Sequence, residues 1–322
     1  MSGTPPKVAV AHYCEGAGHA TRMLAVVEEL EGAGYDVVLA GGGPGTKFVE
    51  ANGYTEFEPR DLDFVGDFQG GGLLDVLKHS GPAIYERISQ YREWFDREAP
   101  ALLVTDDISA AIAASLHGQR YVYLSHDPAD FYANPVERVG AWVRNRVARR
   151  GAEQFLVPKV WDGDPSIPGA DGVPPMAPAG GAPEADVDVL VVPSEFSVDP
   201  DRLADALEAR GRDVTLVGGD DWELQESLQP FIAGANLVIC SGYSTVMEAA
   251  VAGTPTIVLP ATSEQRGVVD ALADTPGFYA ADSIAGVEAL LDSVRAPDPH
   301  ANGAKRVAEV AATYLPEPPR AD

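Results

Sequence analysis

The sequence predicts an α/β protein built from two Rossmann-like domains that face each other across a cleft. Short apolar runs alternate with helical patterns in both halves of the chain, which is typical of parallel sheets flanked by helices. Residues 163–183, GDPSIPGADGVPPMAPAGGAP, interrupt this alternation with Pro and Gly and are expected to form no regular element. At 322 residues the chain is long enough to bury two cores. We therefore expect an N-terminal domain at 1–162, a linker at 163–185 and a C-terminal domain at 186–322.

Each half of the chain is predicted to begin with a strand and to continue as alternating strands and helices. In the first half the expected strands are 8–13, 37–40, 55–59, 101–105 and 121–124, and the expected helices are 20–32, 47–52, 82–98 and 109–117. In the second half the expected strands are 187–192, 214–217, 237–240 and 256–259, with a helix at 200–210 and further helices near the C-terminus. Sheets of this kind bind ligands at the carboxyl ends of their strands, so the functional residues should lie there.

Acidic residues dominate the composition: 49 Asp and Glu against 23 Lys and Arg give a formal charge of −26. Such a chain repels itself at low salt and binds nucleic acid poorly, so we expect no nucleic-acid partner and interpret the charge as halophilic adaptation. An acidic protein of a mesophile is the alternative. The two cysteines, Cys14 and Cys240, suggest neither a disulfide framework nor a zinc site, which fits a reducing cytoplasm. The N-terminus has no signal-peptide pattern, and no apolar run approaches the ~18 residues of a membrane span.

The most informative stretch is 241–272, SGYSTVMEAAVAGTPTIVLPATSEQRGVVDAL. An apolar run ends in a turn at Gly242, and Ser244 or Thr245 is expected to cap the helix that follows. A helix N-terminus binds phosphate because its first N–H groups are unpaired and lie at the positive end of the helix dipole. The glycine lets backbone approach the ligand closely. One turn further on, Glu248 is placed to accept hydrogen bonds from two neighbouring hydroxyls such as a ribose diol.

A second pair of polar residues follows the next predicted strand. Glu264 and Gln265 stand at the start of another helix, where a carboxylate and an amide can read sugar hydroxyls. The bulky Tyr243, in the turn before the first helix of this stretch, either lies over such a donor or points away from it.

The first half opens with its own signature, AHYCEGAGHATRM, at 11–23. A strand is followed by a turn containing Gly16 and Gly18, by His19 where a helix begins, and by Arg22 one turn later. A dinucleotide-binding loop is one interpretation. However, the third glycine of G-x-G-x-x-G is missing, and no acidic residue clearly ends the second strand. A capping or packing role for the histidine is the other alternative.

The pattern G-x-G-H-x-x-R at 16–22 and the stretch at 241–272 resemble, in that order, the two halves of GT-B glycosyltransferases. The likeness is to the family 28 and UDP-glucuronosyltransferase-like group, which includes the bacterial GlcNAc transferase of peptidoglycan synthesis. The first loop also resembles the UDP-sugar hydrolases of pseudaminic acid biosynthesis. The resemblance covers residues 7–30 and 237–272 and rests elsewhere on strand order. Two departures are the turn Ser241-Gly242-Tyr243-Ser244, where paired glycines are common, and Glu264-Gln265, where Asp-Gln or Gln-Gln is common.

This resemblance implies inverting transfer from a UDP-sugar, with UDP-GlcNAc favoured, and without a bound metal or other cofactor. His19 is expected to take the proton of the acceptor hydroxyl, a role that suits an imidazole with an ordinary pKa near ~6.5. Asp106 and Asp107, after the fourth strand, are expected to orient His19 or the acceptor, and we take Asp107 as the second catalytic residue; helix capping is the alternative. The donor contacts are expected from Gly16, Gly18, Arg22, Gly242, Tyr243, Ser244, Thr245, Glu248, Glu264 and Gln265.

Two further features carry weaker signals. His126, in Ser125-His126-Asp127 after the fifth strand, either approaches the cleft or belongs to a capping turn. Residues 136–150, VERVGAWVRNRVARR, carry five arginines against one glutamate in an amphipathic pattern. A helix with this pattern can rest on an anionic membrane, and an internal surface that neutralises the acidic remainder is the other interpretation.

Together these observations predict a cytoplasmic glycosyltransferase, with peripheral contact at the inner face of the membrane as an additional expectation. The acceptor stays open among a lipid-linked sugar, a glycan and a small molecule. A UDP-sugar hydrolase of the same fold, in which His19 activates water, is the main alternative. A non-catalytic nucleotide-sugar-binding protein is the other, and it would need no base.

Overall fold

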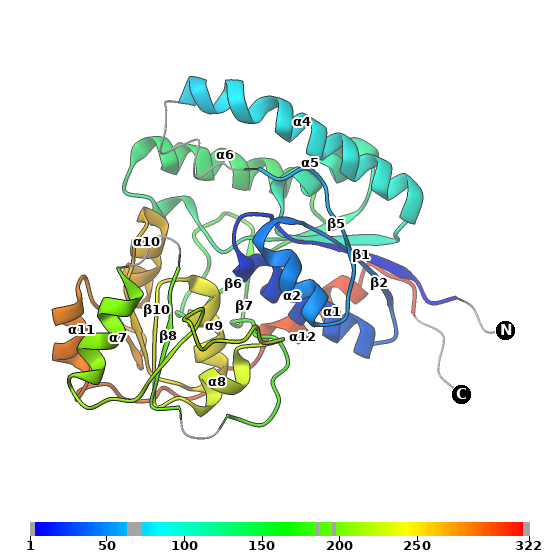
Figure 1. Ribbon diagram of the computed structural model, residues 1–322. Coiled ribbons are helices and arrows are strands. Elements are labelled where there is room, and N and C mark those ends of the chain that lie inside the picture. Colours follow the sequence, from blue (N-terminus) through cyan, green and yellow to red (C-terminus); the bar gives the residue numbers. More distant parts are fainter. Residues whose placement is uncertain (1–3, 63–72, 185–186, 195–197, 318–322) are drawn as a thin grey trace.

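The computed structural model describes residues 4–62, 73–184, 187–194 and 198–317, and these form two parallel β-sheets (Figure 1). The first sheet consists of β1 (Lys7–Ala11), β2 (Asp36–Ala40), β3 (Glu56–Phe57), β4 (Leu102–Thr105), β5 (Tyr121–Leu124), β6 (Gln154–Pro158) and β7 (Asp171–Val173). The second consists of β8 (Val189–Val192), β9 (Val214–Leu216), β10 (Leu237–Cys240), β11 (Thr256–Val258) and β12 (Phe278–Ala280). The predicted α/β class is thus confirmed.

Strand order fixes where ligands can bind in each sheet. The orders are β3-β2-β1-β4-β5-β6-β7 and β12-β11-β10-β8-β9, and neighbouring strands run parallel. The order reverses between β1 and β4 in the first sheet and between β8 and β10 in the second. Crevices at the carboxyl ends of such strand pairs are the usual ligand sites of open parallel sheets.

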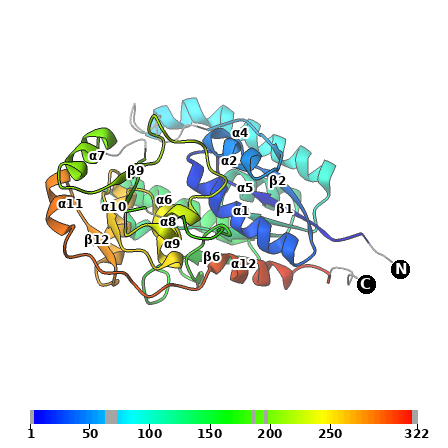
Figure 2. The ribbon, with the colours of Figure 1, turned by 60° about the horizontal axis from the view of Figure 1, so that its bottom comes forward.

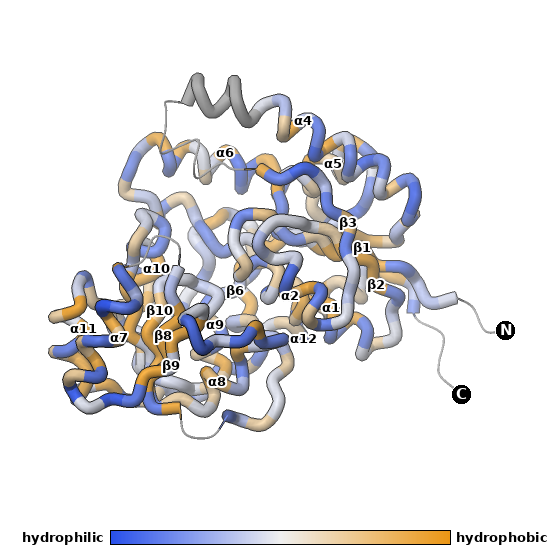
Figure 3. Tube along the Cα trace, in the orientation of Figure 1, coloured by the Kyte–Doolittle hydropathy of each residue, from blue (hydrophilic) through white to orange (hydrophobic). Residues whose placement is uncertain are grey.

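The central strands are largely apolar because helices cover both faces of the sheet. β4 and β5 read LLVT and YVYL, and every residue in them is buried. Continuous apolar runs of this kind are typical of parallel strands. Figure 3 shows the strands as the hydrophobic centre of each half of the molecule, with hydrophilic residues spread over the surrounding helices.

The helices of the first half are α1 (Ala17–Gly32), α2 (Thr46–Ala51), α4 (Leu73–Glu98), α5 (Ile108–His117) and α6 (Pro135–Gly151). Local signals set their ends. The Asp107 side chain accepts from Ser109 N (2.7 Å) to cap α5. Gly118 ends that helix at a φ of 80°, a conformation that favours glycine. α4 begins earlier than predicted and continues through Pro82.

The helices of the second half are α7 (Pro200–Glu208), α8 (Gln229–Gly234), α9 (Tyr243–Ala252), α10 (Ser263–Leu272), α11 (Ile284–Leu290) and α12 (Gly303–Ala312). None of the helices in the described ranges is both long enough and apolar enough to span a bilayer.

Two predicted boundaries are wrong in detail. Residues 163–183 were expected to lack regular structure, but β7 lies within them and pairs with β6, because Val173 is buried at the edge of the first sheet. The predicted C-terminal domain, 186–322, also loses its last helix to the first half. The apolar face of α12, formed by Ala304, Val307 and Ala311, packs in the same core as α1. Figure 2 shows α12 lying along α1.

Candidate active site between the two sheets

His19 lies at the start of α1, directly beyond the carboxyl end of β1. Gly16 provides the N-cap of α1 with a φ of 90°, which makes His19 the third residue of the helix. Asp106 directly follows the neighbouring strand β4, and its Oδ2 lies 2.8 Å from His19 Nδ1. Its other oxygen accepts from Tyr13 N (2.9 Å). Parallel pairing of β1 and β4 therefore brings the imidazole and the carboxylate together.

Arg22 completes this cluster from the next turn of α1. Its Nη2 forms an ion pair with Asp106 Oδ2 and lies 2.9 Å from His19 Nδ1. The side chain is almost fully buried, and its Nε has no hydrogen-bond partner within the described residues. Arg22 was predicted to bind the sugar donor. In the structure it contacts His19 and Asp106, and its buried Nε–H group remains available for a hydrogen bond to a ligand.

The pKa values of His19 and Asp106 are both lowered, but for different reasons. Burial lowers the pKa of His19 below its usual value and outweighs the opposing charge of Asp106. Burial acts to raise the pKa of Asp106, but the charges of His19 and Arg22 hold it well below its usual range. Asp106 is therefore ionised, and in the tautomer of neutral His19 that donates its Nδ1 proton to Asp106, the unprotonated Nε2 can act as a base.

Asp107 was predicted to be the second catalytic residue, and the structure places its carboxylate elsewhere. It is fully buried, caps α5, and accepts from Arg87 Nε (2.9 Å) and Tyr91 Oη (2.8 Å) of α4. Successive residues at the end of a strand point to opposite faces of the sheet, so only one of two adjacent aspartates can reach His19. That residue is Asp106. The capping alternative describes Asp107.

His126 follows β5 and lies between His19 and the second sheet. The ring centroids of His126 and His19 are 5.3 Å apart. On its other side the His126 ring stacks on Tyr243, at 6.0 Å between centroids and 19° between planes. Its Nε2 lies 3.2 Å from Glu264 Oε1 of α10. Sequence reasoning noticed this histidine without placing it in the site, and its position directly after a central strand was the available signal.

The N-terminus of α9 faces the N-terminus of α1. Gly242 is the N-cap of α9 and no side chain caps the helix, so the predicted capping by Ser244 or Thr245 is wrong: both lie inside the first turn. Instead, Ser244 Oγ donates to Gly18 O (3.0 Å). A Cβ at Gly18 would lie 2.4 Å from Ser244 Oγ, so this approach requires glycine.

Tyr243 points toward the first half of the chain. It is buried, and its hydroxyl donates to Pro158 O (3.1 Å) at the end of β6. Trp161 packs against its ring at 5.8 Å between centroids. Tyr243 therefore forms part of the contact between the two sheets.

Glu248 is buried on α9 without a hydrogen bond to its carboxylate from any described residue. Burial raises its pKa to about 8. An unpaired buried carboxyl group is costly to keep, and such groups are frequent at ligand sites. Thr245, on the same helix, is 8% exposed and close to the same interior.

Glu264 and Gln265 begin α10 and differ in what they leave free. Gln265 forms a capping box with Thr262, and its Oε1 accepts from Ala261 N (2.7 Å) and Thr262 N (3.3 Å). Only its amide N–H groups are therefore left for a sugar. Glu264 reaches across to His126 as described above.

A second buried pair supports the end of β1. His12 Nε2 lies 2.7 Å from Glu56 Oε2, and both side chains are 1% exposed. Burial opposes a charged imidazole, but Glu56 outweighs it and raises the pKa of His12. Glu56 Oε1 also accepts from Thr46 Oγ1 (2.7 Å) and Gly42 N (3.2 Å). This pair anchors the loop after β2 beside the site, and sequence reasoning missed it.

No protein-family model and no curated protein sequence matches the chain, whereas solved structures do. The glycotransferase of kitacinnamycin aligns with 97% of this chain and 100% of its own, at a TM-score of 0.66 and 15% identity. SsfS6, a glycosyltransferase of Streptomyces sp. SF2575 complexed with thymidine diphosphate, aligns over 96% and 95%, at a TM-score of 0.65 and 15% identity. MurG of Acinetobacter baumannii aligns over 96% and 100%, at a TM-score of 0.63 and 15% identity. The chain thus has the two-domain GT-B fold of these proteins.

Proposed function

We propose that the protein is a glycosyltransferase that moves a sugar from a UDP-sugar to an acceptor hydroxyl, with UDP-GlcNAc as the favoured donor. One observation carries this proposal: a His–Asp pair at the end of one sheet faces an uncapped helix N-terminus and an unpaired buried carboxyl group on the other. The first supplies a base, and the others suit a diphosphate and a ribose.

The proposed reaction is a single displacement at the anomeric carbon. His19 Nε2 takes the proton of the acceptor hydroxyl while the oxygen attacks, and the bond to the UDP oxygen breaks on the opposite face. Ionised Asp106 holds the Nδ1 proton and stabilises the imidazolium that forms. This arrangement inverts the anomeric configuration.

The leaving diphosphate is proposed to bind at the first turn of α9. Gly242 leaves the backbone N–H groups of that turn without a side-chain cap, and the helix dipole favours negative charge there. Gly18 brings the start of α1 against Ser244 of α9, and the open space at Gly16 leaves room for the phosphates. The unpartnered Nε of Arg22 is an additional donor nearby in the cluster. Fixed donors of this kind stabilise the charge that develops on the leaving group.

The nucleoside is proposed to extend from α9 toward β8. Glu248 would accept hydrogen bonds from the two ribose hydroxyls. A small apolar hollow of about 10 Å³ lies at the carboxyl ends of β8 and β10, lined by Val192, Pro193, Leu203, Ser241 and Leu259, and a planar base would have to move these side chains to enter it. Thymidine diphosphate lacks the 2′-hydroxyl, so a site built on Glu248 should bind UDP more tightly than thymidine diphosphate.

A peripheral membrane contact through α6 is also proposed. Its residues Val136, Val139, Trp142, Val143 and Val147 are 43–60% exposed. Within the described chain, the ion pair of Arg144 with Asp127 is the link between an α6 arginine and an acidic side chain. Arg138, Arg146, Arg149 and Arg150 are exposed. An exposed apolar row flanked by arginines that form no ion pair within the described chain favours an anionic lipid surface over an internal counter-surface.

Nucleotide release distinguishes the candidate activities. The purified protein would be incubated in high salt with UDP-GlcNAc, UDP-glucose and thymidine-diphosphate sugars, each with and without a panel of lipid-linked sugars, glycans and small molecules. Release that depends on an acceptor supports the transferase. Release of UDP without an acceptor identifies a hydrolase in which His19 activates water. Binding without turnover identifies a non-catalytic binding protein, and absence of nucleotide binding rejects the proposal.

A further inference from the structure

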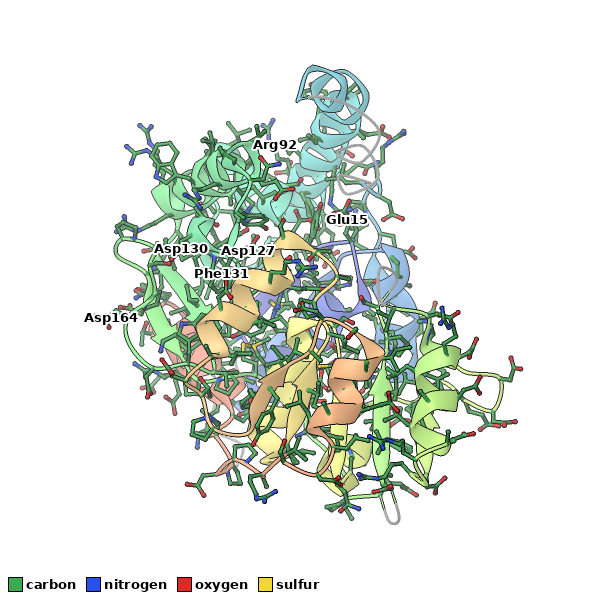
Figure 4. All side chains as sticks on the ribbon, turned by 90° about the vertical axis from the view of Figure 1, so that its left-hand side faces the viewer. Glu15, Arg92, Asp127, Asp130, Phe131 and Asp164 are labelled. Carbon is green, nitrogen blue, oxygen red and sulfur yellow. The ribbon has the colours of Figure 1, made fainter. Side chains whose placement is uncertain are left out.

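Helix α10 of the second half meets one short stretch of the first half, residues 126–137. Ser263 Oγ donates to Glu137 Oε2 (2.6 Å) at the start of α6. A Cβ at Gly267 would lie 2.4 Å from Phe131 Cα, so the helix and this stretch are in direct contact. Figure 4 shows Asp127, Asp130 and Phe131 beside α10. The contact of His126 with Glu264 lies at the N-terminal end of this stretch.

His126 is held firmly by its two neighbours in sequence. Ser125 N donates to Leu156 O (2.9 Å), which fixes the chain to β6. Asp127 accepts from Tyr132 Oη (2.9 Å) and forms an ion pair with Arg144. The His126 ring itself contacts His19 on one side and Tyr243 on the other. Its position is therefore determined before any contact with α10 is counted.

Glu264 presents its two oxygens differently. Oε1 lies 3.2 Å from His126 Nε2, and the side chain is 28% exposed. Oε2 forms no hydrogen bond within the described part of the chain, so it can accept from a ligand. The backbone at Glu264 is fixed by the capping box of Thr262 and Gln265. The direction of the Glu264 side chain, by contrast, is set by its contact with His126.

We propose that His126 is a positioning residue for the donor sugar: it holds Glu264 from across the cleft, so that the free carboxylate oxygen accepts from a sugar hydroxyl close to His19. This inference rests on the proposed function and adds a residue to it. The residue that sets the sugar-reading carboxylate belongs to the opposite half of the chain. Recognition of the sugar therefore requires the two halves to be in contact. If they moved apart, Glu264 would lose its fixed direction and the sugar would bind more weakly.

Donor binding with and without the sugar tests this positioning role. Titration calorimetry would compare UDP, which lacks the sugar, with UDP-GlcNAc. His126→Ala should weaken UDP-GlcNAc binding about five- to tenfold, the size of one ordinary hydrogen bond, because Glu264 keeps its carboxylate and loses only its fixed direction, and should leave UDP within about twofold. His126→Gln keeps a donor and should recover part of the loss. In His126→Ala/Glu264→Ala the effects should not add, because each single change removes the same contact.

The matched control is His117→Ala, which removes a histidine that contacts Asp96 at 3.8 Å on the far end of α5. It should change neither affinity. Equal weakening of UDP and UDP-GlcNAc by His126→Ala would overturn the inference, because it would indicate a general loss of structure. An unchanged affinity for UDP-GlcNAc would overturn it as well.

Hydrogen exchange of the ligand-free protein tests the contact without any donor. His126→Ala and Glu264→Ala should each raise exchange at 261–267 while His117→Ala does not, and unchanged exchange would overturn the inference. If the wild-type protein bound no nucleotide at all, the proposed function would fail and the sugar-reading role with it. In that case raised exchange would show that the contact itself exists.

Discussion

At His19, two groups of opposite charge meet the same ring nitrogen. Burial is the largest influence and disfavours a protonated imidazole, Asp106 favours it, and Arg22 adds a smaller effect in the same direction as burial. The net result is a pKa below the usual ~6.5, so the base is neutral at neutral pH. Activity should therefore be present at neutral and higher pH and fall only as the pH drops below that lowered pKa.

His19→Ala should lower turnover by about 10²- to 10⁴-fold, the usual contribution of a positioned proton acceptor. Donor binding should stay nearly intact, because α9 and Glu248 of the second half hold the nucleotide. The acidic limb of the pH profile should disappear. Steady-state kinetics and calorimetry with UDP would measure both effects. Near-wild-type turnover would return His19 to a structural role, and equal loss of binding and rate would make it a diphosphate ligand.

Glu248 combines a cost to folding with a proposed gain in binding. Because its pKa is raised to about 8 from 4.5, the empty site keeps the carboxyl group protonated at pH 7. Ribose hydroxyls favour the ionised form, so UDP binding at pH 7 should release roughly one proton, and affinity should rise as the pH increases toward 8. Glu248→Ala should weaken UDP binding by roughly 1.5–3 kcal/mol.

Glu248→Gln provides the control for folding. A raised pKa means that the folded protein loses stability as the pH rises from 4.5 toward 8, and the amide removes this loss. The melting temperature of the empty variant should thus equal or exceed that of the wild type at pH 8. Calorimetry in buffers of different ionisation enthalpy would count the protons. Unchanged UDP affinity in Glu248→Ala would disprove the ribose contact.

From the sequence, the residues of the candidate site could be predicted only where the signal comes from neighbouring positions in the chain. A glycine turn after an apolar run identified His19 and the α9 N-terminus, because turn and helix start are local. The choice between Asp106 and Asp107 depends on which way a strand end is pleated, and a pair of adjacent aspartates does not reveal this. His126 and Glu264 lie 138 positions apart in the sequence (264 − 126), and their contact arises only when the two halves pack together.

Among the elements, α6 is unusual because its large apolar side chains are exposed to solvent. Its buried face is formed by Ala141, Asn145 and Ala148, and the larger valines and Trp142 lie outside. Arg146 lies over the Trp142 ring at 5.5 Å, so charge and aromatic surface are presented together. Figure 1 shows α6 on the outside of the molecule near α4. This arrangement fits a flat partner better than a buried interface.

We expect the protein to bind vesicles that contain phosphatidylglycerol and not vesicles of phosphatidylcholine at low salt. Arg146→Gln/Arg150→Gln should lower the partition constant about ten- to thirtyfold, since each arginine near an anionic surface contributes ~1 kcal/mol. Trp142→Phe should remove the blue shift of fluorescence on binding. Leu116→Gln, on exposed α5 surface, serves as the control and should bind normally. Equal binding to both vesicle types would reject the electrostatic contact.

β7 and α12 show why element order was predictable and element partners were not. Asp171-Gly172-Val173 has a single apolar residue, and it becomes a strand because β6 offers an unpaired edge. The α12 helix carries an ordinary apolar face, which would pack equally well on its own half. Its return to the first half depends on tertiary contacts, including Asn302 Nδ2 donating to Ala177 O (2.7 Å). Such contacts leave no local pattern.

At the scale of the whole molecule, the two halves meet through side chains that also form the candidate site. Gly18 and Ser244 join the two helix N-termini, and His126 and Glu264 join the first half to α10. The helix α12, which follows the second sheet in the sequence, packs against α1 of the first half and links the two halves away from the candidate site. Movement of the halves would therefore change the geometry of the site directly, which makes the stability of the closed form relevant to activity.

The formal charge of −26 opposes that closed form at low salt. Added KCl has two effects of opposite sign. It weakens exposed ion pairs such as Arg60–Glu86 and Arg266–Asp282, each worth ~0–1 kcal/mol, and it screens the repulsion among the excess acidic side chains. Because acidic residues outnumber basic ones by 49 to 23, the second effect should dominate.

We therefore expect the melting temperature to rise substantially from low to molar KCl, as the Debye length falls from ~10 Å at 0.1 M to ~3 Å at 1 M. Differential scanning calorimetry across this range would measure the rise. Sucrose is the control, because it stabilises compact states by exclusion from the protein surface without screening charge. A rise with KCl that exceeds the rise with sucrose at equal osmolality indicates screening. A flat or falling curve in KCl would remove the argument for halophilic adaptation and leave the acidic composition as a matter of solubility alone.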